Sequence, residues 1–148
     1  MAAAVPPPLS YRLVESSSDV ILESEAADLG GALVFLAQGF SHVVTAGTKL
    51  EPKEQREVRV EREGGLGDLA VAFVNELIFL FDTARFLPVD GTIRVSIGKT
   101  NVASGTLHGE TFDPGRHAVG TEVKAATLHE AVLVKDGRSA RARVLLDL

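Results

Sequence analysis

The sequence contains no cysteine. This absence excludes disulfide bonds, thiolate metal sites and cysteine nucleophiles. A chain without cysteine suits the cytoplasm, which is the location we expect for this protein.

Basic residues are fewer than acidic residues. Lysine and arginine together number 15 against 20 acidic residues, which leaves a net charge of −5. Because proteins hold phosphate backbones mainly through Lys and Arg, we expect no strong direct binding of nucleic acid. The charge bears on the partners of the protein and not on its fold.

Long apolar runs are also missing. The longest, Leu69 to Phe81, is interrupted by Asn75 and Glu76 and is too short to span a bilayer, so we expect no membrane span. Residues 1–10 lack the basic segment of a signal peptide. The glycine-rich stretch at 64–67 matches neither a phosphate-binding loop nor a dinucleotide fingerprint.

Length and composition predict one domain with a substantial core. The chain has 148 residues, of which 45% are hydrophobic and 24% charged, close to the usual balance of soluble globular proteins. We expect residues 1–10 to form a disordered tail, because Pro6-Pro7-Pro8 favours an extended backbone. Residues 11–148 then form the domain.

Two segments have the apolar spacing of helices. The first follows Ser24, a predicted N-cap, and its apolar residues recur at helical spacing from Leu29 to Val43. The second runs from Leu69 to about Asp82 and has Asp68 as its predicted cap. Because this second segment is apolar on nearly all sides, we expect it to be the central buried helix.

About eight short segments have the apolar patterns of strands. Asp136-Gly137 is a strong hairpin signal before the last of them. Two helices among about eight short strands predict a single compact α+β domain with a mixed or antiparallel sheet. The predicted strands are residues 11–14, 20–23, 57–63, 92–97, 102–108, 119–127, 129–135 and 141–148.

Oxygen donors near both ends of the domain point to a cation site. Asp147 lies next to Leu148, and the terminal carboxylate of Leu148 is expected to add a second negative group at the end of a buried strand. Such groups repel each other unless something positive holds them. Asp19, at the start of an early strand, is the candidate third donor. An all-oxygen set suits Ca²⁺, Mg²⁺ or Mn²⁺, with water completing the shell.

The remaining polar candidates have structural explanations that we favour. Glu76 lies in an apolar helix, so we expect it either to meet a basic partner such as Lys124 or to tether backbone groups. His117 and His129 are candidates for a general base or a metal ligand, but lone histidines on strands are more often structural. Glu110 is a weak acid–base candidate, because the sequence offers neither a nucleophile motif nor a phosphate loop beside it.

Five short motifs and one aspartate extend over nearly the whole chain, from Tyr11 to Leu148. They are Val74–Asp82, Gly109-Glu110, Asp113–His117, Val123–His129 and Asp147-Leu148, preceded by Asp19-Val20. In this order and spacing they resemble the archease family. No single motif is specific, and the ordered set carries the resemblance.

The resemblance implies a small α+β accessory protein with no catalysis of its own. Archeases assist RtcB-type RNA ligases, which join RNA ends in tRNA splicing and RNA repair, by promoting guanylylation and turnover of the ligase. They also bind a divalent metal, which is calcium in some members. Carried onto this chain, the metal ligands are Asp19, Asp147 and Leu148, the last through a main-chain or terminal oxygen.

Two other functions stay open. A metal-dependent enzyme acting on RNA or another phosphoester needs an open coordination site and a base, for which His129 or Glu110 is available. A general protein modulator or chaperone on the same scaffold would fit two departures from the family pattern. Ser16-Ser17-Ser18 replaces the usual His-Thr-Ala, and Thr45–Thr48 lacks the usual acid. Leu128, in place of a tyrosine, is a smaller change.

Overall fold

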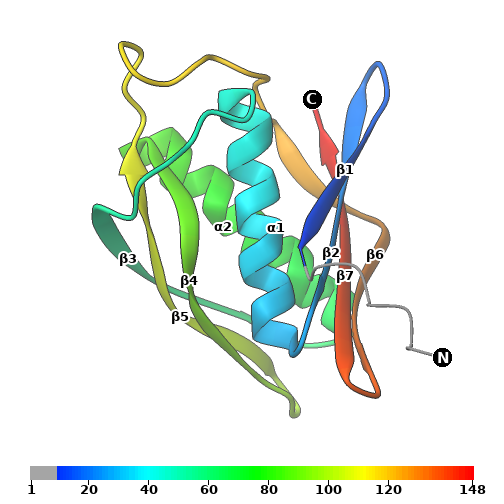
Figure 1. Cartoon of the computed structure of the whole chain (residues 1–148). Helices are drawn as coiled ribbons and strands as arrows, with labels where there is room; N and C mark the ends of the chain where they lie inside the picture. Colours follow the sequence, from blue (N-terminus) through cyan, green and yellow to red (C-terminus); the bar gives the residue numbers. More distant parts are fainter. Residues whose placement is uncertain (1–9) are drawn as a thin grey trace, which may run out of the picture.

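The computed structural model describes residues 10–148, so the tail predicted for residues 1–10 lies outside the described residues except for Ser10. Two antiparallel sheets form the outer layers, and two helices lie between them (Figure 1). This arrangement confirms the predicted α+β class with two main helices. The core lies between the sheets and is built from both helices and from the inward side of each sheet.

Seven strands occur in the described part of the chain, in two sheets rather than one. The first sheet has the strand order β1-β2-β7-β6, the second has the order β3-β5-β4, and every neighbouring pair is antiparallel. The elements are β1 (Tyr11–Glu15), β2 (Asp19–Ala26), α1 (Leu29–Thr45), β3 (Glu54–Arg62), α2 (Leu66–Ala84), β4 (Phe86–Ser96), β5 (Asn101–Thr111), β6 (Ala125–Asp136) and β7 (Ser139–Asp147).

The predicted strands at residues 119–127 and 129–135 are wrong in their boundaries. Residues 119–124 belong to an irregular loop, and one strand, β6, covers residues 125–136. This strand bulges, because Thr127 pairs with Leu145 while the next paired residue, Val132, faces Arg143. At a bulge, residues lose their cross-strand pairing while the strand stays in its sheet. A break in the alternation of apolar and polar residues therefore does not require a turn between two strands.

Helix α1 begins later than predicted. Strand β2 continues through Ser24 to Ala26, and the Ser24 hydroxyl faces inward and donates to the Ala32 carbonyl at 2.7 Å. The N-cap is Asp28, whose side chain accepts a hydrogen bond from the Gly31 amide at 2.7 Å. Asp28 therefore satisfies one of the free amides of the first turn, which is the role we predicted for Ser24.

Helix α2 is not the central buried helix. It packs mainly against β6 and β3, the edge strands of the two sheets, and leaves one face open with Phe79 57% exposed. Most residues of α1 are buried, because α1 lies against both β4 and β2. The N-cap of α2 is Gly65, and the Asp68 carboxylate accepts from the Gly65 amide at 3.2 Å. Within residues 10–148, neither helix combines the length and apolar character that a membrane span needs.

Gly30 lies directly against the backbone of β4 in the second sheet, and alanine there is expected to destabilise the fold. A Cβ atom at Gly30 would meet the Ile93 carbonyl oxygen at 1.7 Å, whereas one at Gly31 would meet the Ala26 Cβ at 3.0 Å. Because a backbone atom cannot step aside, Gly30→Ala should cost about 3 kcal/mol despite the better helix propensity of alanine. Urea unfolding measures this loss. The matched variant Gly31→Ala should stay within about 1 kcal/mol of the parent, and equal stability of both variants would contradict the close packing.

Candidate functional site

The structure brings Asp19 and Asp147 together. Asp19 is the first residue of β2, Asp147 is the last residue of β7, and the two are direct cross-strand partners. The Leu148 amide donates to the Ser18 carbonyl at 3.2 Å, so the next pair along the ladder is the hydrogen-bonded one. Asp19 and Asp147 therefore form a non-hydrogen-bonded pair, the type in which facing side chains lie closest.

Both carboxylates lie on the outer face of the first sheet. The inward residues of β2 and β7 are buried and alternate with these outward positions. Asp19 is half-buried, Asp147 is exposed and Leu148 is half-buried. The site is therefore an open rim at the end of the sheet, accessible to water and to another protein.

The serine triplet takes part in the site. The Ser16 hydroxyl donates to the Asp19 side-chain oxygen Oδ1, and the Ser16 amide donates to the Asp19 carbonyl at 3.0 Å. These bonds close the turn between β1 and β2 and orient the Asp19 carboxylate. The residues that depart from the usual family pattern thus support the candidate ligand directly.

Strand β6 completes this corner of the molecule. Ala125 is the cross-strand partner of Asp147, and the Lys124 amide donates to the Asp147 carbonyl at 2.9 Å. In residues 10–148, no three His, Asp or Glu side chains gather as a metal-binding group. A cation at this corner would therefore find side-chain donors in Asp19 and Asp147, and its other donors would be main-chain oxygens and water.

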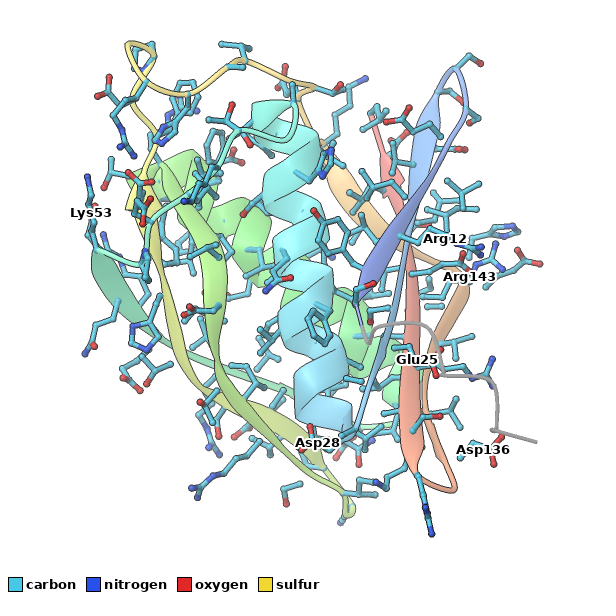
Figure 2. The ribbon with its side chains drawn as sticks, viewed as in Figure 1. Arg12, Glu25, Asp28, Lys53, Asp136 and Arg143 are labelled. Atoms are coloured by element: carbon cyan, nitrogen blue, oxygen red, sulfur yellow. The ribbon has the colours of Figure 1, made fainter. Side chains whose placement is uncertain are left out.

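A second polar cluster surrounds Glu110 at the end of β5, in the other sheet. Its side chain is only 5% exposed, yet it accepts from the Glu51 amide at 2.6 Å and pairs with Arg116. The Lys53 ammonium lies 3.9 Å away, on the side of the molecule opposite Arg12 (Figure 2). Burial acts to raise the pKa of Glu110, but the Glu51 amide and the Arg116 charge outweigh it and hold the pKa below its usual value.

His117 belongs to the same cluster. Its ring is buried, its Nδ1 accepts from the Asp113 amide at 2.8 Å, and its Nε2 lies 3.5 Å from a Glu110 oxygen. An accepting Nδ1 leaves Nε2 as the protonated nitrogen of the neutral ring, so the proton points toward Glu110. This geometry anchors the loop after β5, and it agrees with the structural role that we favoured for His117.

His129 lies in the bulge of β6. Its side chain is exposed, and its Nε2 lies 3.8 Å from an oxygen of Glu130. Glu130 has a φ of 52° and also pairs with Arg143 at 3.3 Å. Figure 2 shows Arg143 on the first sheet, so the acid next to His129 is paired with a residue of the neighbouring strand β7.

Asn75, a polar residue of α2, has a role that we did not predict from the sequence. Asn75 donates to the Ala126 carbonyl at 3.3 Å and accepts from the Ala126 amide at 2.9 Å. It thereby occupies the hydrogen-bonding position of a further strand at the edge strand β6. The ion pair expected between Glu76 and Lys124 is not among those of residues 10–148, because Glu76 lies on the partly open face of α2, where water solvates it.

Comparison with known proteins identifies the family. The model of the Archease protein family (MTH1598/TM1083) matches residues 11–148. The chain belongs to the archease family. This assignment confirms the resemblance seen in the sequence motifs, and it is consistent with the non-catalytic accessory role that we expected.

Relatives and solved structures agree over most of the chain. The protein archease of Archaeoglobus fulgidus is 32% identical over 143 residues, covering 95% of this chain and 100% of the relative. That of Thermococcus kodakarensis is 35% identical over 129 residues, covering 84% and 89%. The solution structure of Methanobacterium thermoautotrophicum protein 1598 has a TM-score of 0.74 at 27% identity, covering 94% and 99%. A crystal structure from Thermotoga maritima, described as an archease and possible chaperone, has a TM-score of 0.51 at 18% identity, covering 91% and 94%, and supports the fold alone.

Proposed function

We propose that this protein activates an RtcB-type RNA ligase, promoting guanylylation and turnover of the ligase in tRNA splicing or RNA repair. We further propose that it does so with a divalent cation, calcium first and Mg²⁺ or Mn²⁺ as alternatives, held by Asp19, Asp147 and a main-chain oxygen of Leu148. The observation that carries the proposal is the direct cross-strand pairing of the two aspartates on an open rim.

The donor set fits a hard cation. Like charges directly opposite each other in an antiparallel pair destabilise the sheet, and a bound cation would reverse this repulsion. Within residues 10–148, neither Asp19 nor Asp147 has an ion-pair partner. Carboxylate and carbonyl oxygens are the ligands that calcium, magnesium and manganese prefer.

The openness of the rim supports action on a partner. With two side-chain donors, a calcium ion would keep several positions for water. A second protein that approached the rim would therefore find replaceable ligands. The residues of this chain supply the carboxylates, and Ser16 fixes the orientation of one of them.

The enzyme alternative lacks a well-placed base. Glu110 is buried against Arg116 and lies in the second sheet, while both aspartates lie in the first. His129 is exposed in the bulge beside Glu130. The chaperone alternative rests on the two departures from the family pattern, the serine triplet at 16–18 and the missing acid at 45–48. A pull-down from the protein's own cells that returned other clients and no ligase would favour it.

Ligase guanylylation tests the proposal. The purified cognate RtcB-type ligase is incubated with GTP and a divalent metal, with and without this protein, and the covalent guanylate on the ligase is followed over time. We expect faster guanylylation and repeated RNA joining in the presence of the protein. No acceleration at any calcium, magnesium or manganese concentration would reject the proposed function.

A further inference from the structure

An apolar groove lies beside the candidate metal centre. It has a volume of about 400 Å³ and is enclosed by the C-terminal halves of α1 and α2 and by the loop at residues 112–123. Its apolar lining includes Phe40 and Val44 from α1, Ile78 and Phe81 from α2, and Phe112 and Val119 from the loop. Phe81 and Phe112 meet edge to face with their ring centres 6.0 Å apart.

The loop wall of the groove is held in place. The Gly120 and Thr121 amides donate to the Val44 and Val43 carbonyls at 2.8 and 2.9 Å, which satisfies the free carbonyls at the end of α1. A Cβ at Gly120 would meet the Val43 oxygen at 2.1 Å, so the loop lies directly on the helix. The Ala118 amide donates to the Thr48 hydroxyl at 2.9 Å. Because this wall is already ordered in the free protein, little conformational entropy is lost when a partner binds to the groove.

One large apolar side chain at this groove is exposed to solvent. Val119 is 77% exposed, the highest value among the exposed large hydrophobic residues of the described chain. A rigid segment that presents an apolar residue to water beside a concave apolar lining has the form of a protein-binding surface.

The charges on the rim define what the groove would accept. Asp82 and Glu122 line it and are exposed, and neither takes part in an ion pair within residues 10–148. The one cation in the lining, Arg85, lies 5.0 Å from the centre of the Phe81 ring and is engaged there. Two free carboxylates around an apolar floor complement an apolar side chain flanked by Lys or Arg.

The groove and the aspartate rim lie toward the same end of the molecule, the groove between the helices and the loop and the rim on the outer face of the first sheet. The groove wall ends at Val123, and the next residue, Lys124, donates its amide to the Asp147 carbonyl. The loop leading into β6, the end of β7 and the turn between β1 and β2 lie at the same end of the molecule (Figure 1). A protein partner that covers this end of the molecule would therefore contact both features.

We propose that this groove is where the ligase docks: it receives an apolar side chain of the ligase flanked by a basic residue, beside the cation held by Asp19 and Asp147. The inference rests on the proposed function and adds the anchoring surface to it. The groove supplies affinity and register, while the aspartate rim faces the partner.

Val119→Glu tests the groove. The variant places a charge in the apolar contact and should weaken binding to the purified ligase by about tenfold or more, with a matching shift in the concentration needed to accelerate guanylylation. Calcium affinity of the free protein should stay within about twofold, because Val119 is not a ligand. Ile97→Glu is the matched control, since Ile97 is 64% exposed in the turn between β4 and β5 and outside the groove. It should bind the ligase like the parent.

A charge variant, compared with the parent protein, distinguishes a wrong docking site from a wrong function. Glu122→Lys should slow association with the ligase and flatten its dependence on salt. If the parent accelerates the ligase and Val119→Glu and Glu122→Lys both bind as tightly as the parent, the groove is not the docking site, although the function stands. If the parent itself neither binds nor accelerates the ligase, the proposed function fails and the groove inference fails with it.

Discussion

Asp147→Ala is expected to lower calcium affinity by at least about tenfold and to abolish most of the acceleration of ligase guanylylation. Affinity at oxygen sites follows the number of charged ligands, and this change removes one of two facing carboxylates. Asp19→Ala should have a similar effect. Neither change should unfold the protein, because Asp147 is exposed and Asp19 half-buried on the outer face of the sheet.

Titration calorimetry with Ca²⁺ and Mn²⁺ measures this loss, and the thermal midpoint gives a second readout. Calcium should raise the Tm of the parent, because a ligand that binds only the folded state stabilises it, and should leave the Tm of Asp147→Ala nearly unchanged. Asp136→Ala is the control, since Asp136 is an exposed aspartate at the opposite end of the β6–β7 hairpin (Figure 2). Unchanged calcium affinity in both Asp19→Ala and Asp147→Ala would show that these two residues do not form a metal centre.

Glu110→Gln is expected to cost about 3 kcal/mol of unfolding free energy at neutral pH. The glutamate is buried and compensates the nearby Arg116, and the amide that replaces it removes the charge while keeping the shape. Glu61→Gln is the matched control, because the Arg59–Glu61 pair is exposed to water on both sides. A solvated pair of this kind should change the stability by less than about 1 kcal/mol.

The pH dependence gives an independent check. Because the pKa of Glu110 is lowered in the folded state, its stabilisation is fully present above the unfolded value of about 4.3 and is lost as the pH falls through the lowered folded value. Urea unfolding between about pH 7 and pH 3 should therefore show the two stability curves converging at the acid end. A constant gap between the parent and Glu110→Gln would mean that the charge of Glu110 contributes nothing.

The buried cluster also bears on docking. Glu110 holds Arg116 and lies beside His117, and these residues begin the loop that forms the groove wall and ends at Lys124. Hydrogen exchange in residues 112–124 should speed up in Glu110→Gln, because the loop has lost the charge that fixes its start. The wall of the proposed docking groove is therefore supported by a carboxylate at the end of β5 in the second sheet.

Local chemistry in the sequence predicted several features correctly. Helical spacing identified both helices, and Asp136-Gly137 marked the hairpin between β6 and β7. These features depend on neighbours a few residues apart, so a single sequence contains them. The boundaries at Ser24 and Asp68 were wrong, because several polar residues near a helix start can each serve as its cap.

The sequence by itself determined the α+β class, the two helices and the family, because periodicity, turn residues and ordered motifs are local or linear properties. Only the tertiary structure decided that the strands divide into two sheets, that Asp19 faces Asp147, and that Glu110 is buried beside His117. Strand pairing and burial can join residues far apart in the chain, by more than a hundred positions in the case of Asp19 and Asp147. They depend on which faces the two helices can cover together, and no short stretch of the chain records that choice.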